Sequence, residues 1–250
     1  MELKVVSFNI RCADDDDGHS IEERAPRLDK VIAPTDADLI GFQEYCPKWE
    51  AHIEKYFGEK YDIFNKYRST ERPESAPILW RKDKFKLIDK GYFWLSDTPE
   101  VESKGWDERF DCHRICEYVI LETLDGGERF NFMNTHFGFG DKCQTASARL
   151  IYDYSKRISD LPTFVVGDFN MRPDSAGYGE MTKYFTDVNA VTAKDTRATY
   201  HGYYRKGNPC HIDYCFVDGK VKPISWELLD GTVDGKYPSD HYGLNIKIKI

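Results

Sequence analysis

Five short polar motifs lie at or beside the ends of apolar runs in this 250-residue sequence, and they carry carboxylates, carboxamides and imidazoles. Such groups are costly to bury unless they face a shared cleft that holds a cation or a phosphate group. Five such ends in one chain are hard to explain as packing, so we expect them to converge. The motifs are Ser7-Phe8-Asn9, Phe42-Gln43-Glu44, Asn134-Thr135-His136, Gly167-Asp168-Phe169-Asn170 and Ser239-Asp240-His241.

Two of the carboxylates, Glu44 and Asp240, are the candidate ligands of a divalent metal ion. Mg²⁺ takes one or two carboxylates and completes its octahedron with water and substrate oxygens. Asn9 could bind the metal through its carbonyl oxygen or orient Glu44. The set offers no covalent nucleophile, so the chemistry it predicts is hydrolysis of a phosphate ester that depends on Mg²⁺ or Mn²⁺, by metal-assisted in-line attack of water.

The motif around Asp168 supplies the candidate base, which would orient or deprotonate the attacking water. Asn170 lies two residues further on and therefore on the same side of an extended segment, where its amide could donate to a phosphoryl oxygen. His136 is a second candidate donor to the substrate phosphate. Arg114, on the approach to a strand, could bind the substrate by adding positive charge, or form an ordinary surface ion pair.

A histidine and a carboxylate form the last candidate pair. His241 would contact the phosphate as a charged donor or proton carrier, and Asp213 would hold its other ring nitrogen. Taken singly, these motifs have ordinary explanations, such as a solvated acid at Glu44, a core histidine at His136 or a turn at residues 167–170. Their occurrence together and in order favours one shared site.

Helix and strand signals alternate along the chain without a linker. A capping box at Ser20 and Glu23 predicts a helix start, and Pro47 can open a second helix. Apolar spacing predicts the longest helix from about Thr145 to Ser159.

Two turn signals predict β-hairpins, one at Asp125-Gly126-Gly127 and one at Asp218-Gly219. The last strand alternates apolar and polar residues up to Ile250, and its exposed lysines, Lys247 and Lys249, are typical of a strand near a sheet edge. Because hairpins require antiparallel pairs, we expect a mixed α/β fold with two sheets packed face to face and helices outside. A single domain over residues 1–250 fits this pattern.

The ordered motifs, together with His211-Ile212-Asp213-Tyr214, resemble the endonuclease/exonuclease/phosphatase superfamily, and the resemblance spans residues 3–250. Phe93-Trp94-Leu95-Ser96 and Lys104-Gly105-Trp106-Asp107 are similar to a bacterial branch related to the deadenylase and nocturnin group. The resemblance implies a four-layer α/β sandwich and divalent-metal hydrolysis of phosphate esters. It also implies the roles given above, position by position.

The charge balance bears on the substrate. Lys and Arg number 35 and Asp and Glu number 43, which gives a net charge of −8. A tight, sequence-blind grip on long nucleic acid needs a basic stripe. We therefore expect a small phosphorylated molecule or a short oligonucleotide as the substrate, and long duplex nucleic acid as an unlikely one. Glu108, Asp111 and the run from Asp14 to Asp17 would add local repulsion if they lie near the cleft.

The cellular context follows from three features. No apolar stretch reaches the 18 residues that a membrane span needs. The first strand starts almost at residue 1, which leaves no room for a signal peptide, and seven cysteines without paired spacing suggest free thiols. These features predict a monomer in the cytoplasm, or a secreted or periplasmic protein if a signal peptide has been removed.

Three functions remain open at this level. The first is a metal-dependent phosphodiesterase or phosphatase acting on a small or short substrate. The second is a nuclease or a poly(A)-deadenylase-like exonuclease, which requires a groove for a polymer. The third is a phosphate-binding module without catalysis, against which the complete set of candidate catalytic residues argues.

Overall fold

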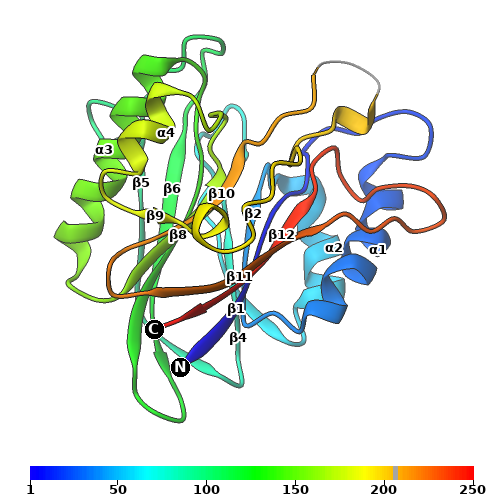
Figure 1. Ribbon diagram of the computed structural model, residues 1–250. Coiled ribbons are helices and arrows are strands. Elements are labelled where there is room, and N and C mark those ends of the chain that lie inside the picture. The colour runs from blue at the N-terminus through cyan, green and yellow to red at the C-terminus, as the bar shows by residue number, and fades with distance from the viewer. Residues whose placement is uncertain (205–207) are drawn as a thin grey trace.

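The computed structural model describes residues 1–204 and 208–250, which form four stacked layers. Two mixed six-stranded β-sheets face each other, and a pair of helices covers the outer face of each sheet (Figure 1). This arrangement confirms the four-layer α/β sandwich that the sequence predicts.

The elements have the following bounds. The helices are α1 (Ile21–Ile32), α2 (Pro47–Phe57), α3 (Asp141–Ile158), α4 (Ala176–Met181) and α5 (Val188–Val191), with 3₁₀ turns η1 (Ala33–Thr35) and η2 (Gly202–Tyr204). The first sheet has the order β11 (Lys222–Leu229), β12 (Gly243–Lys249), β1 (Glu2–Asn9), β2 (Leu39–Gln43), β4 (Ile78–Arg81) and β3 (Tyr61–Phe64). The second has the order β5 (Phe85–Trp94), β6 (Ile115–Thr123), β7 (Arg129–His136), β8 (Thr163–Asp168), β10 (Asp213–Val217) and β9 (Thr186–Asp187).

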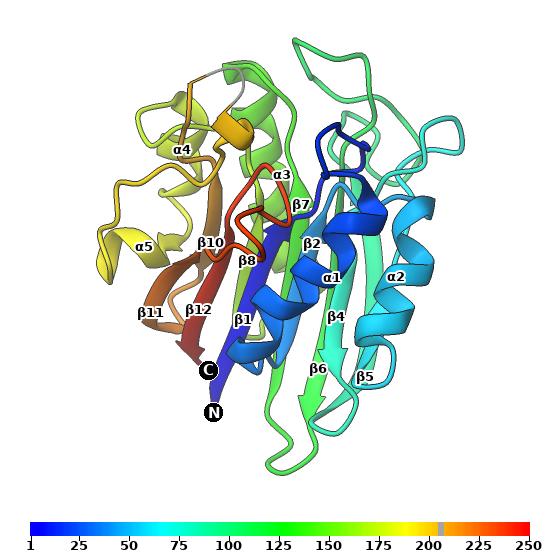
Figure 2. The same ribbon diagram turned by 90° about the vertical axis from the view of Figure 1, so that its right-hand side faces the viewer.

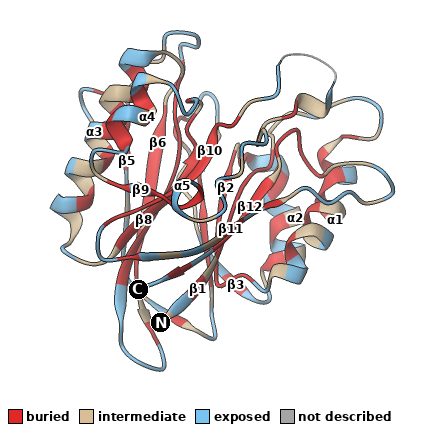
Figure 3. Ribbon diagram, viewed as in Figure 1, coloured by how far each residue is buried: buried red, intermediate tan, exposed pale blue. Residues whose placement is uncertain are grey.

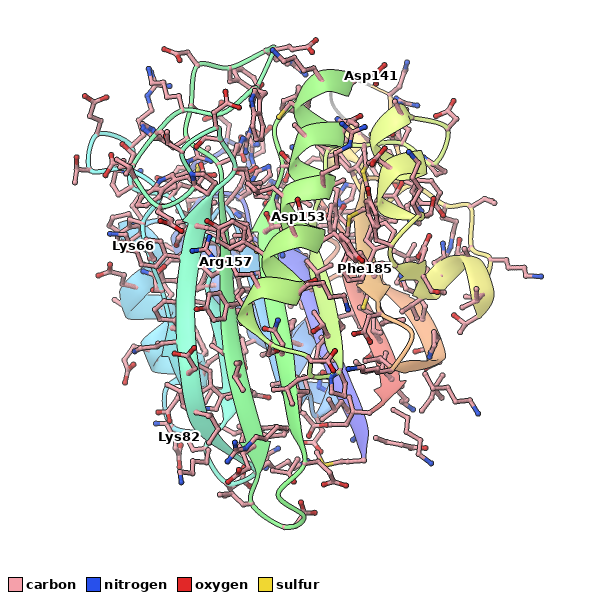
Figure 4. The ribbon with its side chains drawn as sticks, turned by 90° about the vertical axis from the view of Figure 1, so that its left-hand side faces the viewer. Lys66, Lys82, Asp141, Asp153, Arg157 and Phe185 are labelled. Atoms are coloured by element: carbon pink, nitrogen blue, oxygen red, sulfur yellow. The ribbon has the colours of Figure 1, made fainter. Side chains whose placement is uncertain are left out.

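Three apolar clusters separate the four layers, because alternate residues of each strand point to opposite faces of its sheet. Val5 and Phe132 belong to the cluster between the sheets. Phe8 packs with α1 and α2 on the outside of the first sheet, and Ile151 of α3 packs on the outside of the second. The buried residues line these interfaces in Figure 3, and Figure 4 shows α3 lying over the second sheet with its polar residues outward, among them Asp153.

The predicted starts of the first two helices are confirmed. Ser20 caps α1 and exchanges hydrogen bonds with Glu23, and α2 begins at Pro47. The longest helix, α3, starts four residues earlier than expected, at Asp141, directly after Gly140 with its positive φ of 95°. Apolar spacing does not reveal this start, because the first turn of α3 is mostly polar.

One predicted hairpin is confirmed and one is wrong. Asp125-Gly126-Gly127 joins the antiparallel strands β6 and β7. Asp218-Gly219 joins no hairpin, because β10 belongs to the second sheet and β11 to the first, so the chain crosses between the sheets there. The last strand lies near a sheet edge, as expected: Lys247 and Lys249 are exposed, and β12 is flanked by β1 and by the edge strand β11.

A polar contact links the two sheets across the apolar interior. The Asn134 amide of β7 donates to the carbonyls of Phe42 (2.7 Å) and Pro77 (2.9 Å), and its oxygen accepts from Gln43 Nε2 (2.7 Å). Gly41 makes room for this contact, since a Cβ there would lie 2.9 Å from Asn134 Cγ. Gln43 and Asn134 therefore hold the sheets together next to the site.

The two termini lie at one end of the sandwich, and the loops that follow β1, β2 and β8 gather at the opposite end (Figures 1 and 2). All seven cysteines are free thiols, as the sequence suggests. Within the described ranges, we find no helix with the length and hydrophobicity needed to cross a bilayer.

Candidate active site

Strand pairing brings the polar motifs to one end of the sandwich. In the second sheet, parallel pairing of β7 with β8 sets His136 beside Asp168, and antiparallel pairing of β8 with β10 sets Asp213 on the other side of Asp168. In the first sheet, parallel pairing of β1 with β2 sets Asn9 beside Gln43, one residue before Glu44. Since all these strand ends meet at the same edge, residues far apart in sequence converge.

A cavity of about 750 Å³ opens where the strand ends meet. Its walls carry more basic than acidic side chains, six arginines against four carboxylates. The arginines are Arg11, Arg68, Arg72, Arg109, Arg114 and Arg172, and the carboxylates are Glu44, Glu74, Asp168 and Asp240. His136, Asn170 and His241 also line it, so seven of the nine predicted site residues face one cavity.

Glu44 is held in place by donors from the first strand and its loop. Its carboxylate accepts from Asn9 Nδ2 at 3.1 Å and from the Cys12 N–H at 3.1 Å. Burial and the nearby Glu74 act to raise the pKa of Glu44, but His136, the Cys12 N–H and His241 outweigh them and lower it. Glu44 therefore presents a charged carboxylate to the cavity.

Asn9 itself lies behind the cavity wall and is fully buried. Its Nδ2 donates to Glu44 and to Asp168, the latter at 2.9 Å, and its Oδ1 accepts from the Arg11 N–H at 3.0 Å. In this arrangement Asn9 orients two carboxylates, which is one of the two roles that the sequence leaves open. Direct metal binding by Asn9 stays a prediction.

Asp240 lies across the cavity from the second sheet and is 4% exposed. Its Oδ2 accepts from Arg11 Nη1 at 3.0 Å, and burial raises its pKa. A buried carboxylate with a raised pKa beside a second carboxylate is the environment that a divalent cation relieves. The oxygen-rich pair Glu44 and Asp240 therefore fits Mg²⁺ or Mn²⁺.

Asp168 occupies the centre of the site. Its carboxylate accepts from the Asn170 N–H at 2.9 Å and from Asn9 Nδ2 at 2.9 Å. Burial, together with the nearby Asp213 carboxylate, raises the pKa of Asp168 to about 7. A carboxylate with this pKa is suited to accept a proton from water near neutral pH.

His241 and Asp213 form the predicted pair. His241 Nδ1 lies 2.9 Å from Asp213 Oδ2, and His241 Nε2 lies 3.7 Å from Asp168 Oδ2. Burial acts to lower the pKa of His241, but the carboxylates of Asp213, Asp168 and Asp240, with Asp213 the largest contributor among them, together raise that pKa to about 10. His241 is therefore a charged donor at neutral pH, while Asp213 lies behind it and holds the ring.

His136 and Asn170 contact each other rather than pointing freely into the cavity. Asn170 Nδ2 lies 3.0 Å from His136 Nε2 and donates to the Phe137 carbonyl at 2.9 Å. Burial and the neighbouring Arg114 lower the pKa of His136 well below its ordinary value. His136 Nδ1 is buried without a hydrogen-bond partner among the described residues.

Two carboxylates of the second sheet, together with His241, offer an alternative metal site. Atoms of Asp168, Asp213 and His241 lie within 4.8 Å of one another, which is close enough to hold an ion. The raised pKa of His241 disfavours it as a ligand, because a metal binds the neutral imidazole. We therefore keep Glu44 and Asp240 as the predicted ligands.

Arg114 lines the cavity and is buried, and its Nε and Nη2 both lie 3.2 Å from Asp107 Oδ2. The alternative of a surface ion pair is thus excluded. Sequence reasoning missed several other residues of the wall, among them Arg11, Arg68 and Glu74. They come from irregular loops, where no periodicity marks them, although Arg68 and Glu74 pair with each other at 2.9 Å.

The comparison with known proteins agrees with this site. The Endonuclease/Exonuclease/phosphatase family model matches residues 6–241, so the fold and the site together define the chain as a member of this family of phosphoesterase hydrolases. A family protein from Bacteroides vulgatus is 27% identical, with a TM-score of 0.91 over 100% of this chain and 99% of its own.

Two further solved structures are similar to the chain. The mannosyl-6-phosphatase of Bacteroides thetaiotaomicron VPI-5482 is 26% identical, with a TM-score of 0.85 over 99% of this chain and 100% of its own. The human nocturnin catalytic domain with bound sulfate is 17% identical, with a TM-score of 0.77 over 99% and 93%. At that identity, nocturnin shows the shared fold alone.

Proposed function

We propose that this protein is a divalent-metal-dependent phosphatase that hydrolyses the phosphate ester of a small molecule. The observation that carries the proposal is the convergence of Glu44, Asp240, Asp168 and His241 on one cavity. They provide an oxygen-rich pair for the ion, a base with a pKa of about 7 and a charged donor.

The roles of the side chains follow from their positions. Glu44 and Asp240 would hold Mg²⁺ or Mn²⁺, which supplies positive charge to the phosphoryl oxygens and the leaving group. Asp168 orients the attacking water and takes its proton. His241 donates to a phosphoryl oxygen, and Asp213 keeps its ring charged and fixed. Arg114 adds a permanent charge to the same wall.

The charge of the cavity favours a monoester as substrate. A phosphate monoester carries up to two negative charges and a diester carries one, so the charges of Arg114 and His241 beside the reacting phosphate stabilise the monoester more. The likeness to a mannosyl-6-phosphatase over the whole chain supports a small phosphorylated substrate. A nuclease or deadenylase activity is the alternative, and it needs a surface that follows a polymer.

A substrate panel tests the proposal. Purified protein with Mg²⁺ or Mn²⁺ is assayed on p-nitrophenyl phosphate, bis-p-nitrophenyl phosphate, a hexose 6-phosphate and oligoadenylate, with Asp168→Asn as the control for contaminating phosphatases. We expect the monoesters to be turned over fastest, and the variant to lose that activity. Oligoadenylate as the best substrate would instead support the nuclease alternative, and no turnover of any ester would contradict the proposal.

A further inference from the structure

A second cavity of about 280 Å³ adjoins the active-site cavity. The two share wall residues, so the second cavity is a side chamber of the first. The shared residues are Arg68, Arg72, Arg109, Phe110 and Cys112. Here "side chamber" means this smaller cavity. Its volume suits one additional substituent of a substrate whose reacting phosphate lies in the main cavity.

The side chamber is basic. Arg68, Arg72, Lys104 and Arg109 line it, against the two acids Glu71 and Asp111. Asp111 is occupied by Lys104, whose Nζ lies 2.5 Å away. Because the basic residues outnumber the acidic ones, the chamber carries a surplus of positive charge.

Two of these arginines are not neutralised. Arg68 pairs with Glu74, but Arg72 and Arg109 have no ion pair with any described residue. Both side chains are exposed and both line the main cavity as well as the side chamber. Two guanidinium groups in the walls of one chamber, without an ion pair to a described residue, offer donors of the kind that bind phosphate.

The position of Arg109 is fixed by its surroundings. Its guanidinium lies 5.1 Å from the ring centroid of Phe110 and 4.9 Å from that of Phe139. Asp107 Oδ1 accepts from the N–H groups of Arg109 and Phe110 at 2.9 and 3.0 Å, while its Oδ2 holds Arg114. One buried carboxylate thus ties the chamber arginine to the arginine of the catalytic wall.

We propose that Arg72 and Arg109 bind a second phosphate group of the substrate, one that is held and not hydrolysed. This inference rests on the proposed function and narrows it to small molecules with two phosphate groups, such as a sugar bisphosphate. Arg72 and Arg109 then determine specificity, while the catalytic residues remain those of the main cavity.

The test compares a hexose 6-phosphate with the matching hexose 1,6-bisphosphate in the presence of metal. We expect the wild-type protein to prefer the bisphosphate by about tenfold or more in kcat/KM, mainly through KM, as charge-assisted hydrogen bonds to a second phosphate would give. The double variant Arg72→Gln/Arg109→Gln should lose this preference and keep its turnover of p-nitrophenyl phosphate within about twofold.

A matched control is Arg157→Gln, an exposed arginine on α3 outside both cavities (Figure 4), which should leave the preference unchanged. Equal kcat/KM for the two sugars, with p-nitrophenyl phosphate still hydrolysed, would overturn the inference and leave the proposed function standing. A preference that persists in the double variant would also overturn it. Absence of turnover with all three substrates would contradict both the inference and the proposed function.

Discussion

Three residues at the site have a left-handed backbone: Arg11, Glu44 and Asn170, with φ of 57°, 57° and 50°. For a residue with a Cβ this conformation costs about 1–2 kcal/mol. Glu44 directly follows the end of its strand, and one residue separates Arg11 and Asn170 from theirs. At these points the chain must turn sharply to direct the side chain toward the cavity. Backbone strain is thus present at three residues that line the cavity, although other described non-glycine residues, such as Asp36 and Lys194, also have a positive φ.

The charge of His241 depends on Asp213, and a pH profile can show this. Because the pKa of His241 is raised to about 10, its charged form persists below that pH and is lost as the pH rises through it. We expect kcat/KM of the wild-type protein on p-nitrophenyl phosphate to fall only near pH 10. In Asp213→Asn the fall should move toward neutral pH, because the largest cause of the raised pKa is gone. Identical alkaline limbs for the two proteins would show that Asp213 does not set this charge.

At the residue scale, the members of the site were predictable where a polar group interrupts an apolar run. Asp168, Asp240 and Glu44 stand out in this way, because an unpaired acid beside a buried strand has a large desolvation cost. The residues that contact these acids were harder to predict. Asn9 could equally bind or orient, and only its hydrogen bonds show it orienting Glu44. Glu74 lies in a loop whose path the sequence does not reveal.

At the scale of elements, the contact of Asn134 with the opposite sheet predicts a specific loss of stability. Asn134→Leu would remove three hydrogen bonds between buried groups, each worth about 0.5–1.5 kcal/mol, although the Pro77 carbonyl and the Gln43 amide keep other partners. We expect the free energy of unfolding to fall by at least about 2 kcal/mol in urea denaturation.

The same strand supplies a matched control. Asn131 is also fully buried, but neither its Oδ1 nor its Nδ2 has a hydrogen-bond partner among the described residues. Asn131→Leu should therefore be neutral or stabilising. If both variants lost the same free energy, the contact between the sheets would have no special role.

Elements and turns were predictable from local sequence, but their place in the sheets was not. Asp125-Gly126-Gly127 and Asp218-Gly219 look alike as turn signals, yet only the first joins paired neighbours. The second leads to a strand in the opposite sheet, and that choice depends on long-range packing. The lysines of β12 correctly indicated a strand near an edge, but they did not show that β11 forms the edge itself.

At the scale of the whole molecule, the net charge of −8 does not describe the cavity, whose walls carry six arginines and four carboxylates. Neither Glu108 nor Asp111 is among the described residues that line the main cavity, and the same holds for residues 14–17. Asp111 lines the side chamber instead, where it pairs with Lys104, and Asp15 pairs with Arg11 of the main cavity. The arginines of the walls lie around one cavity, and the negative net charge still disfavours long nucleic acid.

The salt dependence of activity distinguishes an enzyme for small phosphate esters from a nuclease that binds a long duplex. Contacts spread along a duplex give an affinity that falls steeply with salt, whereas a site for one or two phosphates gives a shallow dependence. We expect kcat/KM for a small ester to change little between low and physiological salt, and plasmid nicking to be weak. Efficient nicking of plasmid DNA at physiological salt, well above small-ester turnover, would favour a nuclease.

The central claim is metal-dependent hydrolysis with separate roles for Glu44 and Asp168, and a metal titration of p-nitrophenyl phosphate turnover tests it most directly. Chelation with EDTA should abolish the activity of the wild-type protein. Glu44→Ala loses a ligand, so added Mg²⁺ or Mn²⁺ should partly restore its rate. Asp168→Asn loses the base, so kcat should fall by about 10²-fold or more at every metal concentration. Full turnover in excess EDTA, or identical titration curves for the two variants, would contradict the account.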